Sequence, residues 1–171
     1  TDEGVDTLYR RIRELQRPVA AAAFNAGIGT SGAFVETPLE DELRTVDLNV
    51  RSTVHLARHL TRDMVDRGEG RLLFTSSVAA TMPGPFQAIY NASKSFVQSF
   101  ALALRNELQD TGVTVTSLMP GPTETEFFDR ADMRDTKIGA GDKDDPADVA
   151  RQGFAALMAG EERVVAGSWK N

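Results

Sequence analysis

A tyrosine and a lysine stand four residues apart in the segment Tyr90-Asn91-Ala92-Ser93-Lys94. On a helix this spacing places both side chains on one face, one turn apart. A free phenol has a pKa of about 10, and a nearby cation lowers it by favouring the phenolate. The pair therefore has the residue types of a general acid–base couple. The plain alternative is a solvated lysine beside a half-buried tyrosine.

Other polar residues are expected to converge on this pair. Three short polar segments each follow an apolar stretch that has the character of a strand: Asn25-Ala26-Gly27, Ser76-Ser77 and Pro120-Gly121. Asn49 interrupts the apolar stripe of a predicted helix. If the strands are parallel, their carboxyl ends meet at one edge of the sheet, where α/β folds bind ligands.

The elements that would position these residues alternate along the chain. Apolar periodicity and Gly or Pro stops predict helices at residues 1–17, 38–67, 90–110 and 146–159. They predict strands at residues 19–24, 72–75 and 113–118, and a last strand beginning at 164–165. This alternation predicts a single α/β domain over residues 1–171, with a Rossmann-like parallel sheet covered by helices on both faces.

Two helix starts carry recognisable capping signals. Thr37-Pro38-Leu39-Glu40 has the pattern of a capping box, with proline at the first helical position. Asp145-Pro146 is a second N-terminal signal, reached through the acidic cluster at residues 142–145. That cluster lacks the spacing of a calcium loop, so we expect a solvated loop there.

Composition excludes several classes of function. The 171 residues include 19 Lys and Arg against 25 Asp and Glu, a net charge of −6. An acidic chain disfavours nucleic acid and acidic membrane surfaces as partners. The longest apolar run, residues 19–24, is far too short to span a membrane. Cysteine is absent, which excludes disulfides and thiolate catalysis and fits a cytoplasmic location.

Two further patterns have a weaker claim to function. Gly27-Ile28-Gly29-Thr30-Ser31-Gly32 matches G-x-G-x-x-G, but the next helix signal comes only at Thr37, too late for a dinucleotide fingerprint. We expect a plain Gly-rich turn. His55 and His59 share a helical face, yet Leu56 replaces the glutamate of the metalloprotease pattern and no third ligand is evident. We expect no metal there, but a surface or interface role.

Taken in order, the motifs resemble the short-chain dehydrogenase/reductase family. Phe24-Asn25-Ala26-Gly27 is similar to the family's Asn-Asn-Ala-Gly, with Phe in place of the first Asn. Ser77 and Tyr90-x-x-x-Lys94 match its serine and Tyr-x-x-x-Lys, and Asn49 matches its helix asparagine. The turn from Pro120 to Thr125 matches Pro-Gly-x-x-x-Thr.

The resemblance implies an NAD(P)-dependent oxidoreductase that interconverts a ketone or aldehyde and an alcohol. Tyr90 would be the general acid and base, Ser77 would polarise the carbonyl, and Lys94 would lower the Tyr90 pKa and bind ribose. Asn49 would hold a water that relays protons. The remaining cofactor contacts, to NAD or NADP, would come from Asn25, Ala26, Gly27, Pro120, Gly121, Thr123 and Thr125.

The same resemblance suggests the partners of the site. The substrate would be a small, apolar carbonyl compound or alcohol. Its binding site would be lined by Ser77, Met82, Phe86 and Phe127, with Phe128 and Met133 nearby. The family also implies a homodimer or homotetramer formed through the helices that hold Asn49 and Tyr90.

The family's glycine-rich cofactor segment has no counterpart in the sequence, so we expect this chain to hold the catalytic portion of the fold. Two hypotheses follow from these expectations: a dehydrogenase/reductase, or a non-catalytic remnant or interaction module unable to bind dinucleotide on its own.

Overall fold

The computed structural model describes residues 1–125 and 141–167. Four parallel strands form one sheet in the order β1-β2-β3-β4. Their bounds are β1 Ala21–Phe24, β2 Gly70–Thr75, β3 Val113–Pro120 and β4 Arg163–Ala166. Because all strands run the same way, their carboxyl ends lie at one edge, which confirms the predicted parallel α/β sheet.

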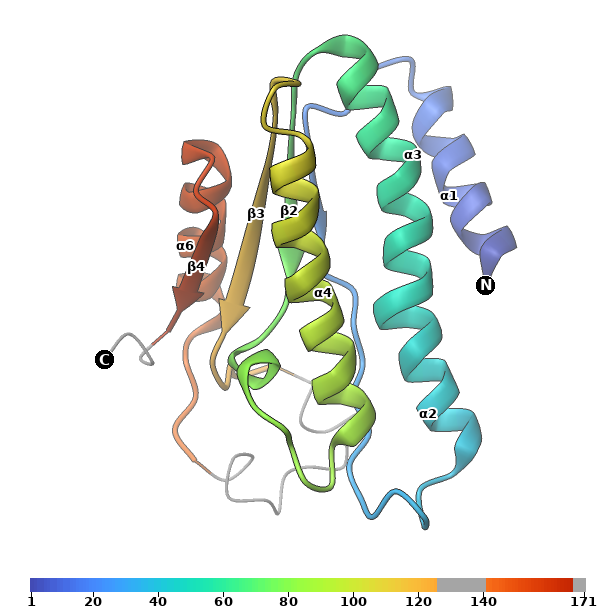
Figure 1. The fold of residues 1–171 in the computed structure, drawn as a ribbon, viewed down its shortest axis with the longest axis vertical. Coiled ribbons are helices and arrows are strands. Elements are labelled where there is room, and N and C mark those ends of the chain that lie inside the picture. Colours follow the sequence, from blue (N-terminus) through green and yellow to red (C-terminus); the bar gives the residue numbers. More distant parts are fainter. Residues whose placement is uncertain (126–140, 168–171) are drawn as a thin grey trace.

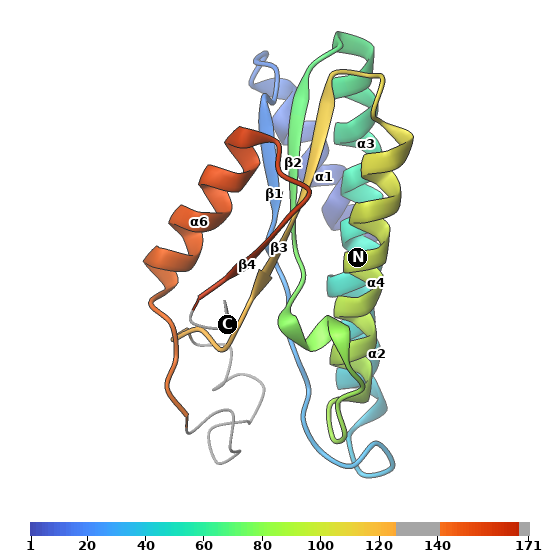
Figure 2. The same cartoon turned by 60° about the vertical axis from the view of Figure 1, so that its left-hand side comes forward.

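Helices cover both faces of this sheet (Figures 1 and 2). Helices α1 Asp2–Glu14, α3 Ser52–Arg67 and α4 Ala88–Glu107 lie on one face, while α6 Pro146–Ala159 lies on the other. α1 forms the outermost layer and packs on α3 rather than on the strands. β1 begins at Ala21, two residues later than predicted, and β3 extends through Pro120.

The predicted capping box is wrong. Helix α2, Leu39–Val46, begins after Pro38, and its N-terminus has no side-chain cap. The Thr37 hydroxyl instead donates to the carbonyl of Ala33, at 3.1 Å, within the preceding turn. The other signal is confirmed, because the Asp145 side chain accepts from the amide of Ala147 and Pro146 opens α6.

The long predicted helix is continuous but not uniform. Between α2 and α3 the chain makes a π-helical turn, Asp47–Arg51, with Asn49 at its centre. Such turns widen the helix locally and are frequent at functional sites. The turn places the Asn49 side chain in the interior, where it is 2% exposed.

The main core lies between the sheet and the α3–α4 layer. Phe74 and Leu72 on β2 and Val115 on β3 are essentially unexposed. The Phe74 ring stacks on Phe24, with centroids 4.6 Å apart, and meets Phe100 edge-on at 5.5 Å. Aromatic pairs of this kind stabilise a core beyond the area they bury. They fix α4 against β1 and β2, and so fix where Tyr90 and Lys94 lie. Among the described helices, none has the length and apolar character needed to cross a membrane.

Candidate active site

Tyr90 and Lys94 lie on the first turns of α4, as the four-residue spacing predicts. The Lys94 side chain is buried at 6% exposure, and its Nζ lies 5.9 Å from the centroid of the Tyr90 ring. Nζ donates to the carbonyl of Thr75 at 2.9 Å, so the lysine reaches the last residue of β2. The pair is therefore held at the carboxyl edge of the sheet, and the solvated alternative is wrong for the lysine.

Ser77 completes this arrangement from the loop after β2. It precedes a short 3₁₀ helix, Val78–Thr81, and its Oγ accepts from the amide of Ala79 at 3.1 Å. The Ser77 side chain also hydrogen-bonds Tyr90. Its neighbour Ser76 donates to the carbonyl of Lys94 at 2.9 Å. Hydrogen bonds at both Tyr90 and Lys94 thus connect the loop after β2 to the start of α4.

Burial governs the protonation of both groups. Desolvation raises the pKa of Tyr90, and the hydrogen bond from Ser77 offsets this only in part. Desolvation also lowers the pKa of Lys94, to about 8. The lowering of the Tyr90 pKa by Lys94 stays a prediction, and burial of the phenol acts in the opposite direction. These surroundings favour a neutral phenol beside a lysine that is mainly an ammonium at neutral pH.

Asn49 holds the Gly-rich loop against α4. Its Nδ2 donates to the carbonyl of Ile28 at 2.8 Å and to Ser93 Oγ at 3.0 Å. Its Oδ1 accepts from the amide of Ile28 at 2.9 Å. Ser93 in turn donates to the carbonyl of Tyr90 at 2.7 Å. Both amide hydrogens of Asn49 are therefore used to connect residue 28 with the backbone that carries Tyr90.

Gly27 lies in this same contact. A Cβ at residue 27 would stand 3.2 Å from Lys94 Nζ and 3.3 Å from Asn49 Oδ1. The loop after β1 thus approaches the lysine as closely as a backbone without a side chain permits. This approach brings predicted residues of the loop after β1, of the π-helical turn before α3 and of α4 into one cluster.

Two residues of the site were missed from the sequence. Asn91 Nδ2 donates to the carbonyls of Ala79 and Met82, each at 3.1 Å, and Ser95 Oγ donates to Ala80 at 2.8 Å. Asn91 and Ser95 are again four residues apart, immediately after Tyr90 and Lys94. That repeated spacing was the available signal. Together, Asn91 and Ser95 hold the loop that follows Ser77 by hydrogen bonds to its backbone.

Comparison with known proteins identifies the family. Residues 1–135 match the sequence profile of short chain dehydrogenases. The chain belongs to the short-chain dehydrogenase family.

Individual relatives agree with this assignment. The chain is 39% identical to serine 3-dehydrogenase of Rhizobium radiobacter over 105 residues, which cover 60% of this chain and 41% of that protein. Its fold matches a short-chain dehydrogenase from Sphingobium yanoikuyae in complex with NADPH, with a TM-score of 0.85 and 25% identity over 94% of this chain and 62% of that one. It also matches the 3-ketoacyl-(acyl-carrier-protein) reductase of Brucella melitensis complexed with NADH, with a TM-score of 0.83 and 27% identity over 98% and 74% of the two chains. The chain spans about half the length of the curated relatives it matches.

In this short-chain dehydrogenase the other predicted cofactor residues lie at the same edge. Asn25 Oδ1 accepts from the Thr75 hydroxyl at 3.0 Å, next to the carbonyl that binds Lys94. Ala26 and Gly27 continue that loop. After β3, which ends at Pro120, the amide of Gly121 donates to the carbonyl of Ala166 at the end of β4. This turn therefore follows the same edge of the sheet.

Of the two threonines in the turn after β3, Thr123 is fixed by hydrogen bonds and by a β-bridge. Thr123 donates to the carbonyl of Gly121 at 2.9 Å and pairs with Asp144 in a short bridge. Thr125 is the last described residue before the gap. The turn is thus stiffened by its own hydrogen bonds and by the segment that leads into α6.

Two of the predicted substrate residues lie on exposed loop positions. Met82 is 55% exposed and Phe86 is 67% exposed. The carbonyl of Phe86 accepts from the amide of Gly32 at 2.9 Å, which joins its loop to the Gly-rich loop. Phe127, Phe128 and Met133 lie outside the described residues.

The expected Gly-rich turn is an irregular loop with a bend at Gly32. No helix opens within residues 27–32, because α2 begins only at Leu39. Its glycines therefore do not present a helix N-terminus to a pyrophosphate. Gly27 instead lies beside Asn49 and Lys94, a role that the G-x-G-x-x-G pattern did not indicate.

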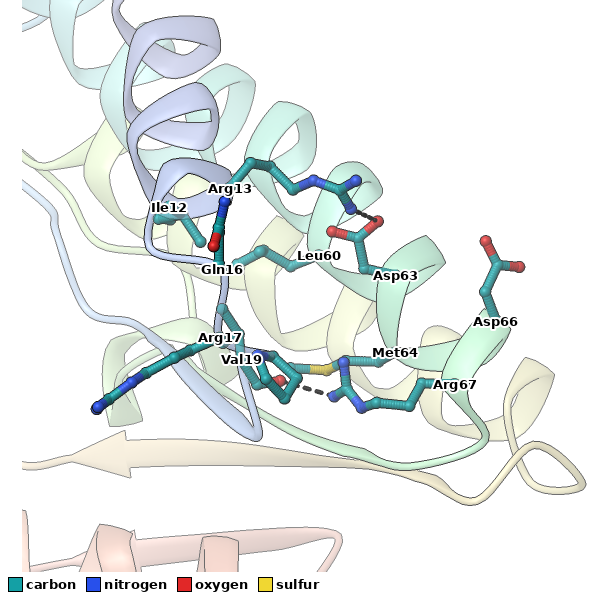
Figure 3. Close-up of a pocket in the computed structure, with 11 residues that line it drawn as sticks. Ile12, Arg13, Gln16, Arg17, Val19, Leu60, Asp63, Met64, Asp66 and Arg67 are labelled. Atoms are coloured by element: carbon teal, nitrogen blue, oxygen red, sulfur yellow. Dashed lines mark hydrogen bonds and ion pairs between the residues drawn. The ribbon is translucent and has the colours of Figure 1, made fainter.

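A surface cavity of about 570 Å³ lies far from this edge (Figure 3). It opens between the C-terminal ends of α1 and α3, beside Val19 at the amino end of β1. Arg13 pairs with Asp63 at 3.4 Å, and Arg67 donates to the carbonyl of Val19 at 2.8 Å (Figure 3). These arginines bind the chain itself, so the cavity does not compete with the Tyr90 edge as the site of chemistry.

Proposed function

We propose that this chain carries the proton-transfer site of an NAD(P)-dependent oxidoreductase that interconverts a ketone or aldehyde and an alcohol. The observation that carries the proposal is the group of a buried Lys94 with the half-buried Ser77 and Tyr90 at the carboxyl edge of the sheet, against the backbone of Gly27. The relatives support it, since they include a serine 3-dehydrogenase and a ketoacyl reductase.

In reduction, Tyr90 would donate its phenolic proton to the carbonyl oxygen while Ser77 donates a hydrogen bond to the same oxygen. Burial keeps Tyr90 protonated, which suits an acid. The phenolate left behind would be stabilised by the Lys94 ammonium and then reprotonated from solvent. A water at Asn49 would relay that proton. It would bind to an oxygen of Asn49, because both amide hydrogens are taken.

The described residues fit the nicotinamide half of a dinucleotide, NAD or NADP. An ammonium has three N–H donors, and Thr75 accepts one of those of Lys94, so donors remain for ribose hydroxyls. Gly27 keeps the adjoining loop free of a side chain where one would press on Lys94. Further contacts would come from Asn25, Ala26, Pro120, Gly121, Thr123 and Thr125. When bound, the cofactor supplies or accepts the hydride. The complexes of relatives with NADPH and NADH support this choice.

The substrate in this proposal is a small apolar carbonyl compound or alcohol, since Met82 and Phe86 offer exposed apolar surface beside the site. Phe127 would add to it. The active form would be a homodimer or homotetramer in the cytoplasm. Exposed apolar side chains on α2 and α4 support association through these helices: Leu39, Leu43 and Phe96.

The test compares the two tyrosines of the sequence. The protein from the complete gene should consume NADH or NADPH with a panel of aldehydes and ketones. Tyr90→Phe should lower kcat by about 10³-fold or more because the acid is gone, while cofactor affinity stays within a few fold. Tyr9→Phe, on the outer helix α1, should keep full activity. Turnover retained in Tyr90→Phe would refute the proposed role.

A further inference from the structure

Three potential metal ligands meet between the outer helix α1 and α3. His55 Nε2 lies 2.9 Å from Asp6 Oδ1, and His59 Nε2 lies 3.7 Å from the same oxygen. The three ligand atoms all lie within 4.8 Å of one another. The histidine pair is visible in the sequence, but the carboxylate comes from a distant segment, so only the fold completes the group.

We propose that Asp6, His55 and His59 bind a divalent transition-metal ion of the zinc type. In a tetrahedral site with bonds of about 2.0–2.1 Å, neighbouring ligand atoms stand about 3.4 Å apart. The two measured separations from Asp6 Oδ1 lie on either side of that value. Small side-chain rotations would therefore accommodate the ion without moving either helix.

Neighbouring groups already orient the two imidazoles. The His59 ring stacks on Tyr9, with centroids 4.3 Å apart and planes 15° from parallel. Tyr9 is itself fixed, since its hydroxyl donates to Asp63 at 2.9 Å. His55 Nδ1 faces Asp2 Oδ1 at 3.8 Å. A carboxylate beside the second ring nitrogen is the usual support of a metal-bound histidine.

The site is open to solvent and has room for water ligands. The side chains of His55, His59 and Asp6 are 26%, 35% and 51% exposed. Two imidazoles and one carboxylate favour zinc, cobalt or nickel over magnesium or calcium, which prefer oxygen ligands. The open coordination positions would be filled by water.

The composition of the chain restricts which residues can supply the nitrogen ligands of such a site. The whole sequence has 2 histidines and no cysteine, and both histidines are in this group. A metal site with two imidazole ligands from one copy of this chain must therefore use this pair. The bound ion would join α1 to α3, where only Val5 of α1 is buried. It would stabilise the chain because it binds the folded state alone.

The experiment is a titration of the purified 171-residue chain with Zn²⁺ by calorimetry, with Co²⁺ as a spectroscopic substitute. We expect one ion per chain, visible bands of low-symmetry Co²⁺ that Zn²⁺ abolishes, and a Tm that rises with Zn²⁺ and falls back with EDTA. His55→Gln and His59→Gln should each weaken binding at least ten-fold.

Two further variants separate the site from general surface binding. Asp6→Asn should abolish most of the rise in Tm, since the link between the helices is cut. Asp66→Asn, on α3 but outside the group, should bind as the parent does, and circular dichroism should show every variant folded. Failure to bind Zn²⁺, or equal affinity after loss of both histidines, would overturn the proposal. None of these outcomes depends on dehydrogenase activity.

Discussion

The chain contains two pairs with the same helical spacing, Tyr90 with Lys94 on α4 and His55 with His59 on α3. Their surroundings differ. α4 packs on the sheet and the loop after β2, so Lys94 is only 6% exposed and reaches the carbonyl of Thr75. The histidines face the outer helix α1, with side chains 26% and 35% exposed.

Spacing thus decides only that two side chains share a face, whereas burial decides the chemistry open to them. At the Tyr90 pair, desolvation shifts the pKa of both groups. That suits directed proton transfer. At the histidine pair, water and ions have access and a carboxylate stands opposite, which suits a metal ion.

The largest effect is expected from Lys94→Met, which removes the buried charge but keeps an unbranched side chain. The variant loses the ammonium that lies 5.9 Å from the centroid of the Tyr90 ring and that would stabilise the phenolate left by proton donation. Activity of the protein from the complete gene should fall about 10³-fold, within the usual range for acid–base groups. His55→Gln should leave kcat unchanged within two-fold. Steady-state kinetics with one aldehyde measures both, and a similar loss in His55→Gln would mean that the two faces are coupled.

The pH dependence of stability should reveal the burial of Lys94 directly. Its pKa is lowered from 10.5 to about 8 in the folded chain, so between these values the unfolded chain binds the extra proton. The free energy of unfolding should therefore rise as pH increases from about 8 to 10, and below pH 8 a constant penalty of about 3 kcal/mol remains. Above pH 10 the raised pKa of Tyr90 acts in the opposite sense, since the unfolded chain loses its phenolic protons first.

Urea denaturation at several pH values, with Lys94→Met as the control, isolates this effect. The rise between pH 8 and 10 should be present in the parent and absent from the variant. If the free energy of unfolding of the parent and the variant changed with pH in parallel, Lys94 would be solvated. The contrast between the Tyr90–Lys94 pair and the histidine pair would then disappear.

A smaller effect is expected from Asn91→Ala, which leaves Tyr90 and Lys94 in place but releases the loop they face. The variant loses the hydrogen bonds to the carbonyls of Ala79 and Met82. Each is worth about 1 kcal/mol, so KM should rise by up to about 30-fold while kcat falls less. Ser95→Ala, which removes one bond to Ala80, should do less. A loss confined to kcat would instead place Asn91 in the proton-transfer step.

Much of this arrangement followed from the sequence, because alternating elements and polar strand ends are local signals. The sequence predicts the parallel sheet, and it predicts that Asn25, Ser77, Tyr90 and Lys94 lie at one edge of it. Predicting the capping box failed because Thr37 had a nearer acceptor in the Ala33 carbonyl.

Other features depended on contacts between distant segments, which periodicity does not report. The burial that raises the pKa of Tyr90 depends on how α4 meets the loop after β2. The π-helical turn at Asn49 and the approach of Gly27 to Lys94 are likewise tertiary. So is the carboxylate of Asp6 opposite the histidines, without which the pair shows no third ligand.

The smallest effects are expected at the exposed loop positions beside Tyr90 and Lys94, which are more exposed than the histidine pair. Phe86 is 67% exposed and Met82 55%, so truncating either to Ala should change the free energy of unfolding by no more than about 0.5 kcal/mol. If these side chains line the substrate site, KM should nevertheless rise a few fold for long apolar aldehydes and stay unchanged for short polar ones. Equal KM changes for both substrate classes would show that these side chains position the loop rather than select the substrate. In that case the exposed fraction of a loop side chain would predict its effect on the free energy of unfolding but not on substrate specificity. The contrast between the Tyr90–Lys94 pair and the His55–His59 pair would then apply only to their buried contacts.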